Sequence, residues 1–238
     1  MPRKGHMKAL IEIFVYPKKA YGKTIIIDPM ITKVNTCMEI EMNWLKRIYG
    51  NDNQEEISAN TPEPLGKTMP VNVFVDASHA GEKLAYNSHP EILIYVNKTP
   101  IDWFSKRKNM VKTFTFGAEV IAARIAMEKV KALRTNLRWI GIPIDGPIYM
   151  FCNNESVAKS TSRVKSTHSK KFQLTSWHSV RETISAGWLR VLKDSGETNL
   201  KDIFTKQLSI QRKENILNQF KIAMVNMSEI KGDTDYNG

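Results

Sequence analysis

An alternating run of apolar and polar residues that ends on a carboxylate is the feature that most constrains the fold of this chain. The run is Val-Asn-Val-Phe-Val-Asp at residues 71–76, and Ala-Ser-His-Ala-Gly follows it. Because successive side chains of a strand point to opposite faces, Asp76 shares a face with Asn72 and Phe74, opposite the three valines. The run therefore predicts a strand that carries an aspartate to one end of a sheet.

The stretch from residue 71 to residue 208 has the pattern of an α/β domain. Apolar runs at Ile92–Val96 and Ile101–Phe104 predict, together with the first run, three antiparallel strands. Apolar residues recur at helical spacing from Gly117 to Arg134, which predicts a helix that packs on this sheet. The remaining predicted elements are a strand at Pro147–Cys152, a helix at Glu155–Ser160, a strand at Trp188–Leu192 and a helix at Leu200–Gln207.

The segments on either side of this domain are interpreted as separate units. Before it, residues 8–16 predict a short helix, Lys23–Asp28 a strand, and residues 44–49 an amphipathic helix, and a polar stretch with several prolines follows. After it, residues 211–227 predict an amphipathic helix. The predicted division is 1–35, then a connecting segment at 36–69, the α/β domain at 70–208, and a helix with a frayed end at 209–238.

The charge of the chain favours a polyanionic partner. Lysine and arginine number 35 against 24 acids, which gives a net charge of +11. Such a balance points towards nucleic acid, although excess lysine can also serve solubility alone. The two cysteines, Cys37 and Cys152, are far apart and form no Cys-x-x-Cys pair, which excludes a zinc knuckle and a disulfide scaffold and fits a reducing, intracellular compartment. No apolar run approaches the ~20 residues of a membrane span.

Three acids have the order found in a metal-dependent nuclease, although each also has a plain structural explanation. Asp76 can simply end a strand, and Glu119 and Asp202 are expected near helix starts, where the macrodipole favours a carboxylate. Together, a strand aspartate, a helix glutamate, a polar residue on the fourth strand and a late aspartate form the layout of a two-metal nuclease. Two hard cations ~3.5–4 Å apart need several negatively charged oxygen ligands, so such sites gather carboxylates.

Five separated motifs carry a specific resemblance to a known family. In order, they are VDASHAG at residues 75–81, FGAEV at 116–120, FCNNESV at 151–157, WHSVRE at 177–182 and KDIFTK at 201–206. In this order and spacing they resemble the ribonuclease H domain of copia-type retrotransposon polyproteins. The stretch from Gly5 to Pro29 is similar to the end of the reverse-transcriptase region in those polyproteins, and residues 44–67 to their connection segment. The Asp-Asp motif of the polymerase is absent, so the resemblance implies a fragment that does not copy nucleic acid.

The resemblance implies a ribonuclease H-like fold, a mixed five-stranded sheet flanked by helices, with a small helical N-terminal extension. It implies hydrolysis of the RNA strand of RNA–DNA hybrids with two Mg²⁺ ions, Mn²⁺ being an alternative, and with no small-molecule cofactor. The implied metal ligands are Asp76, which would bridge both ions, Glu119 and Asp202. The fourth member of the catalytic set is an acid in the family and Asn153 in this chain.

Asn153 is the departure that matters most for activity. An asparagine keeps one coordinating oxygen but lacks the negative charge and carries a donor amide in place of the second oxygen. We therefore expect weaker binding of a divalent cation and a large loss of hydrolytic rate. Glu155 is expected to lie in the next helix and not to substitute. Phe172 stands where the family usually has a histidine. His178 is interpreted as a structural or substrate-side residue, and the plain explanation is a half-buried histidine beside Trp177.

Two basic clusters are candidates for binding a nucleic-acid backbone. Lysine and arginine neutralise phosphates whatever the base sequence, and recognition of a hybrid would then depend on groove shape and the 2′-hydroxyl. The alternative is a pair of solvated loops. The candidate residues are Lys106, Arg107, Lys108, Lys159, Arg163, Lys165, Lys170 and Lys171.

Three interpretations stay open from the sequence. The chain is a slow or metal-selective nuclease, or it is an inactive hybrid-binding module or decayed transposon reading frame, or it is a basic structural protein without a metal site. The sequence does not determine the oligomeric state.

Overall fold

The computed structural model describes residues 23–25, 27, 30, 42–50, 57–79, 88–106, 115–163, 174–194, 211 and 222–224. The helices predicted at residues 8–16 and 200–207 lie outside these residues. In the part of the chain that is described, no helix combines the length and the apolar character needed to cross a membrane.

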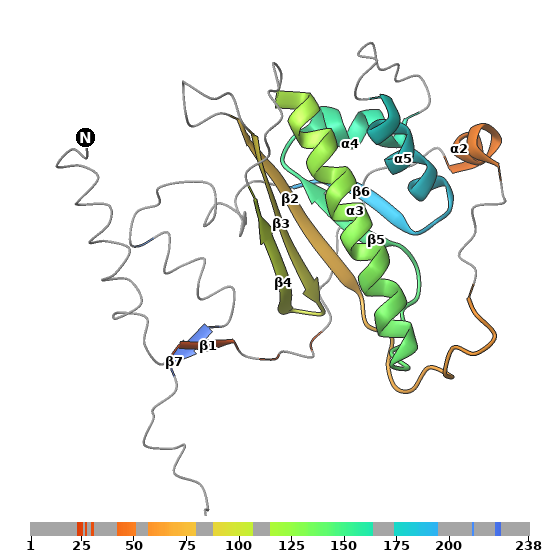
Figure 1. The fold of residues 1–238 in the computed structure, drawn as a ribbon, viewed down its shortest axis with the longest axis vertical. Coiled ribbons are helices and arrows are strands. Elements are labelled where there is room, and N and C mark those ends of the chain that lie inside the picture. Colours follow the sequence, from red (N-terminus) through yellow and green to blue (C-terminus); the bar gives the residue numbers. More distant parts are fainter. Residues whose placement is uncertain are drawn as a thin grey trace, which may run out of the picture.

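The centre of the protein is a mixed five-stranded sheet (Figure 1). Its strands are β2 (Val71–His79), β3 (Ser88–Val96), β4 (Thr99–Ser105), β5 (Ile148–Cys152) and β6 (Leu189–Lys193). They lie in the order β4-β3-β2-β5-β6, with the first three antiparallel and β5 and β6 parallel to β2 and to each other. The predicted ribonuclease H-like architecture, a mixed five-stranded sheet flanked by helices, is confirmed.

One face of the sheet carries the hydrophobic core. The valines of β2 point to this face with Ile92, Ile94 and Met150, and all of them are buried. Three helices pack against it: α3 (Thr115–Trp139), α4 (Glu155–Ser162) and α5 (Leu174–Ser185). Helix α3 extends beyond its predicted bounds at both ends. Helix α5 was not predicted, although its buried residues Trp177, Val180 and Ile184 have helical spacing.

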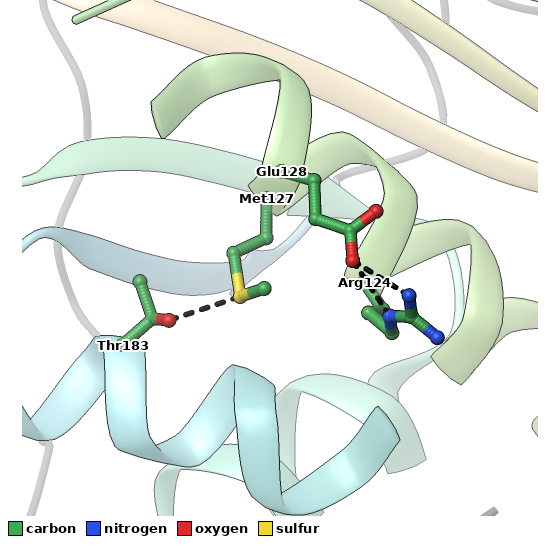
Figure 2. Close-up of polar contacts among 4 residues, drawn as sticks. All are labelled: Arg124, Met127, Glu128 and Thr183. Atoms are coloured by element: carbon green, nitrogen blue, oxygen red, sulfur yellow. Dashed lines mark hydrogen bonds and ion pairs between the residues drawn. The ribbon is translucent and has the colours of Figure 1, made fainter. Parts of the chain in front are cut away.

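Helices α3 and α5 contact each other through a buried polar group, as Figure 2 shows. The Thr183 hydroxyl of α5 lies 2.9 Å from Met127 Sδ of α3. On the outer side of α3, Arg124 and Glu128 form an ion pair at 2.7 Å, with both side chains about half exposed. This pair lies within α3, and an exposed pair of this kind adds little to stability.

The direction of α3 fixes which of its ends lies near Asp76. The Leu65 amide donates to the Gly141 carbonyl at 2.8 Å, and the Met69 amide donates to Pro143 at 2.9 Å. Residues 65–69 lead directly into the start of β2, so the C-terminal end of α3 lies beside that start. The first turns of α3 therefore lie at the opposite end of the sheet, where β2 finishes.

Two further pieces of the chain are described outside the sheet and its three helices. Helix α2 (Met42–Tyr49) confirms the amphipathic helix predicted at residues 44–49. It lies against α5, and its residue Leu45 belongs to the same hydrophobic core as the sheet. Strand β1 (Lys23–Ile25) pairs antiparallel with β7 (Ile222–Met224). The helix predicted at residues 211–227 is therefore wrong at Ile222–Met224, where backbone pairing with β1 replaces intrahelical bonds. The predicted division into four segments stays a prediction.

Candidate active site

Asp76 lies near the end of β2, on the sheet face opposite the valine core, as the alternation predicts. Its side chain is 7% exposed. Its Oδ1 atom accepts a hydrogen bond from the Ala77 amide at 2.9 Å, which restrains the carboxylate. The residue is therefore a buried, oriented carboxylate near the C-terminal end of the central strand of the sheet.

Asn153 lies level with Asp76 on the neighbouring parallel strand. The last register pair between β2 and β5 is Val75 with Cys152, so the next residue of each strand, Asp76 and Asn153, continues the same row. Asn153 is exposed, and the Asn154 side chain after it caps α4 by accepting from the Ser156 amide at 2.9 Å. The strand register thus places Asp76 and Asn153, which belong to two different motifs, on adjacent strands at the same end of the sheet.

Glu119 lies in the second turn of α3, because the helix begins at Thr115, two residues earlier than predicted. The macrodipole acts mainly on the first turn, so it does not explain a carboxylate at this position. Glu119 is half-buried, and this end of α3 lies at the end of the sheet that carries Asp76. The helix macrodipole, which is the structural reason considered for Glu119 from the sequence, therefore does not account for its position.

The sequence interpretation missed two buried acids in the same row. Glu91 of β3 is the register partner of Asp76. The Asp194 amide donates to the Cys152 carbonyl at 2.8 Å, which continues the β5–β6 ladder and sets Asp194 level with Asn153. Both side chains are buried. The available signals were a glutamate directly before one apolar run and an aspartate two residues after another.

The described donors are oxygen atoms of the kind that Mg²⁺ prefers. Asp76 and Glu119 supply two carboxylates, and Asn153 supplies an amide oxygen. Among the described residues, no three His, Cys, Asp or Glu side chains gather as a group able to hold a metal ion. The remaining acid of the predicted set, Asp202, lies outside the described residues. The described donors, two carboxylates and one amide oxygen, are of types that a magnesium ion accepts.

Glu155 is engaged away from this row. It forms ion pairs with Lys159, one turn further along α4, and with Lys193 at 3.1 Å. The hydrogen bond and charge of Lys159, followed by those of Lys193, lower the pKa of Glu155 to about 2. These contacts agree with the expectation that Glu155 does not replace the acid missing at Asn153.

Three of the eight basic candidates lie in described residues. Lys106 follows β4 at the end of the sheet where Ser105, Glu91 and Asp76 form one row, and it is exposed. Arg163 directly follows α4 and is exposed, and Lys159 is exposed but paired with Glu155. The other candidates, Arg107, Lys108, Lys165, Lys170 and Lys171, lie outside the described residues, as does Phe172.

His178 lies away from the row, at the contact between α2 and α5. Its Nδ1 atom is 2.6 Å from the Tyr49 hydroxyl, and its ring meets the Trp177 ring edge-on at 4.9 Å. The side chain is exposed, not half-buried as expected. These contacts support the structural role that was predicted for it.

The similar proteins found by comparison are of the kind that the motifs resemble. No family model matches the chain. It is 25% identical over 160 residues to the retrovirus-related Pol polyprotein from transposon RE1 of Arabidopsis thaliana, and 26% identical over 172 residues to that from transposon RE2. The matches cover 67% and 70% of this chain. The resemblance inferred from the motifs is confirmed.

The chain spans only 11% of the length of each of these polyproteins. Among solved structures, it is similar to LC11-RNase H1 in complex with RNA/DNA hybrid, with 14% identity, a TM-score of 0.43, and coverage of 54% of this chain and 88% of that one. It is also similar to the foamy viral protease-reverse transcriptase in complex with RNA/DNA hybrid, with 16% identity, a TM-score of 0.39, and coverage of 68% and 21%.

Proposed function

We propose that this chain binds RNA–DNA hybrids through a ribonuclease H-like domain and that Asn153 impairs its hydrolysis of the RNA strand. The observation that carries the proposal is the row at the end of the sheet, in which Asp76 and Asn153 are level on adjacent strands. Helix α3 begins at the same end and brings Glu119 with it. This arrangement supports an ancestral hydrolytic site with one charge removed.

In this proposal the carboxylates of Asp76 and Glu119, with Asp202, hold divalent cations. When bound, such cations supply positive charge that activates a water molecule and stabilises the leaving oxygen. The Ala77 amide holds the Asp76 carboxylate in one orientation. Asn153 offers an amide oxygen without charge, so the set attracts a cation less strongly. Lys106 and Arg163, both exposed, would neutralise phosphates of the hybrid.

A second candidate is a hybrid-binding module without hydrolytic activity. Asn153 itself favours it, because removing one member of a coupled catalytic set costs far more than a proportional share of the rate. Binding to phosphates does not need the missing carboxylate. The two candidates therefore differ in turnover and agree on the ligand.

Cleavage of a labelled RNA–DNA hybrid in Mg²⁺ and in Mn²⁺ separates these candidates. Asn153→Asp restores the acid and should raise the rate by about a hundredfold or more. Asn154→Asp is the matched control, since it adds the same charge one residue away at a helix cap that aspartate also fills. Equal rates for wild type and Asn153→Asp would refute the role given to Asn153. Failure of every variant to bind a hybrid would refute the proposed function as a whole.

A further inference from the structure

His89 lies on the same sheet face as Asp76, one row further towards the end of β2. In the ladder between β2 and β3, His89 pairs with Ser78 and Glu91 pairs with Asp76. Because side chains two residues apart on a strand share a face, His89, Glu91 and Asp76 point to the same side of the sheet. His89 and Asp76 are therefore diagonal neighbours on adjacent strands, roughly 7–8 Å apart between backbones, a separation that an aromatic side chain can span.

The strand fixes the direction in which the His89 side chain leaves the backbone. Pro90 follows His89, and a residue before proline is restricted to extended backbone conformations. The ladder continues past His89 to the pair of Ser88 with His79, so His89 lies within the regular part of β3. Little backbone freedom is therefore lost when a ligand contacts this residue.

The imidazole ring of His89 is available to a ligand. The side chain is half-buried, and the described residues provide its ring with no hydrogen bond or ion pair. His178 is the contrasting case, since its Nδ1 atom lies 2.6 Å from the Tyr49 hydroxyl. A neutral imidazole carries one donor and one acceptor, so the His89 ring can both donate to and accept from a bound molecule.

The surroundings of His89 indicate which group of a nucleic acid it meets. Asp76 and Glu91 are buried acids, and two carboxylates at this distance disfavour a phosphate beside His89. A hydroxyl carries no charge and, like imidazole, both donates and accepts. In the proposed function one phosphate of the RNA strand lies at Asp76, and the neighbouring group along that strand is a ribose. The 2′-hydroxyl is what distinguishes this ribose from deoxyribose.

We propose that His89 forms a hydrogen bond with a 2′-hydroxyl of the RNA strand and thereby favours RNA–DNA hybrid over DNA duplex. The juxtaposition that carries the proposal is a ring without a hydrogen-bonding partner among the described residues, on the same face as Asp76 and in the adjacent row. The inference rests on the proposed function, because it requires the RNA strand to reach that row. It assigns strand selection to a residue other than the acids that would hold cations.

Equilibrium binding of the full chain to an RNA–DNA hybrid and to a DNA duplex of the same sequence, without divalent cation, tests this contact. His89→Ala should weaken hybrid binding about three- to tenfold, the usual effect of one hydrogen bond, and leave duplex binding unchanged. His89→Gln keeps a donor and an acceptor and should recover most of the loss. His178→Gln is the matched control, since His178 lies at the contact between α2 and α5, and it should bind both ligands like wild type.

A scan of the RNA strand locates the contacted nucleotide. Replacing each ribose in turn by deoxyribose should weaken wild-type binding about three- to tenfold at one position, and that position should lose its effect in His89→Ala. The slope of log affinity against log salt should be the same for wild type and His89→Ala, because a hydroxyl contact releases no counterion.

The alternative results separate this inference from the proposed function. Equal losses for hybrid and duplex in His89→Ala, with a salt slope smaller by about one, would show a phosphate contact and overturn the assignment to the 2′-hydroxyl. A wild type that binds hybrids while His89→Ala is indistinguishable from it would overturn the inference and leave the proposed function standing. A wild type that binds no hybrid would overturn both.

Discussion

Leu45 decides whether the segment before the sheet is a linker or part of the folded domain. Its side chain has 0% exposure and belongs to the core that also contains the sheet. Helix α2 has only eight residues, too few to be stable alone in water, so its helical state depends on packing against α5. Leu45→Ala removes that packing at its centre and leaves helix propensity unharmed.

The cost follows from complete burial. Leucine-to-alanine changes at fully buried sites cost about 2–5 kcal/mol, and detachment of α2 limits the loss to the free energy with which α2 docks. We expect the free energy of unfolding to fall by about 2–4 kcal/mol. For a chain of this size, each kcal/mol lowers the melting temperature by roughly 2–4 °C, so the expected shift is about 4–16 °C.

Thermal and urea unfolding of the full chain, followed by circular dichroism, measures this shift. Ile48→Ala is the matched control, since Ile48 lies on the same helix and is 49% exposed, and its effect should stay within about 0.5 kcal/mol. If Leu45→Ala proved as harmless as Ile48→Ala, α2 would be a tethered segment and the reasoning from burial would be wrong. The predicted boundary at residue 70 would then hold.

Two further predictions concern polar contacts. Burial raises the pKa of Tyr49, so its hydroxyl stays protonated and can donate to His178 at 2.6 Å; Tyr49→Phe should cost about 0.5–1.5 kcal/mol in the same unfolding assay, and no change would deny the bond any role in docking α2. The pKa of Glu155 is lowered to about 2 by Lys159 and Lys193, so the stability that its ion pairs contribute is fully present above about pH 4.5 and is lost as the pH falls through about 2. A side-chain carboxyl titration by NMR should show this low midpoint, and Lys193→Met should raise it; a midpoint at the ordinary glutamate value would contradict the contacts.

The sheet could be predicted because its strands have strong local patterns. Val71–Asp76 alternates cleanly and Pro147–Cys152 is apolar throughout, so each marks a strand whatever its partners. Helix α5 has a weaker local signal: Trp177, Val180 and Ile184 have helical spacing, but the helix has only 12 residues. Its helical state depends on contacts with α2, α3 and α4, which come from distant parts of the chain. Tertiary packing decides such a segment, and local propensity does not.

The same distinction between local sequence pattern and tertiary structure separates the site residues that could be predicted from those that could not. Asp76, Glu119 and Asn153 could be found because each lies in a recognisable motif. Glu91 and Asp194 lie in no motif, and their places beside Asp76 and Asn153 follow from strand register. Register is fixed by which strands pair and by how the hydrophobic faces align, so a single strand's sequence does not contain it.

The neutral side chain of Asn153 also affects the electrostatic energy of this row, because it lies between Asp76 and Asp194. Both neighbours are buried, and strands in a sheet are about 4.8 Å apart. An aspartate at position 153 would complete a row of four acids with Glu91, Asp76 and Asp194, with repulsion on the order of 1–3 kcal/mol per adjacent ionised pair near the surface when no cation is present. The neutral amide removes that repulsion. Under the proposed function, Asn153 would exchange cation affinity for stability of the metal-free fold, an exchange that favours a domain kept for binding and costs one kept for hydrolysis.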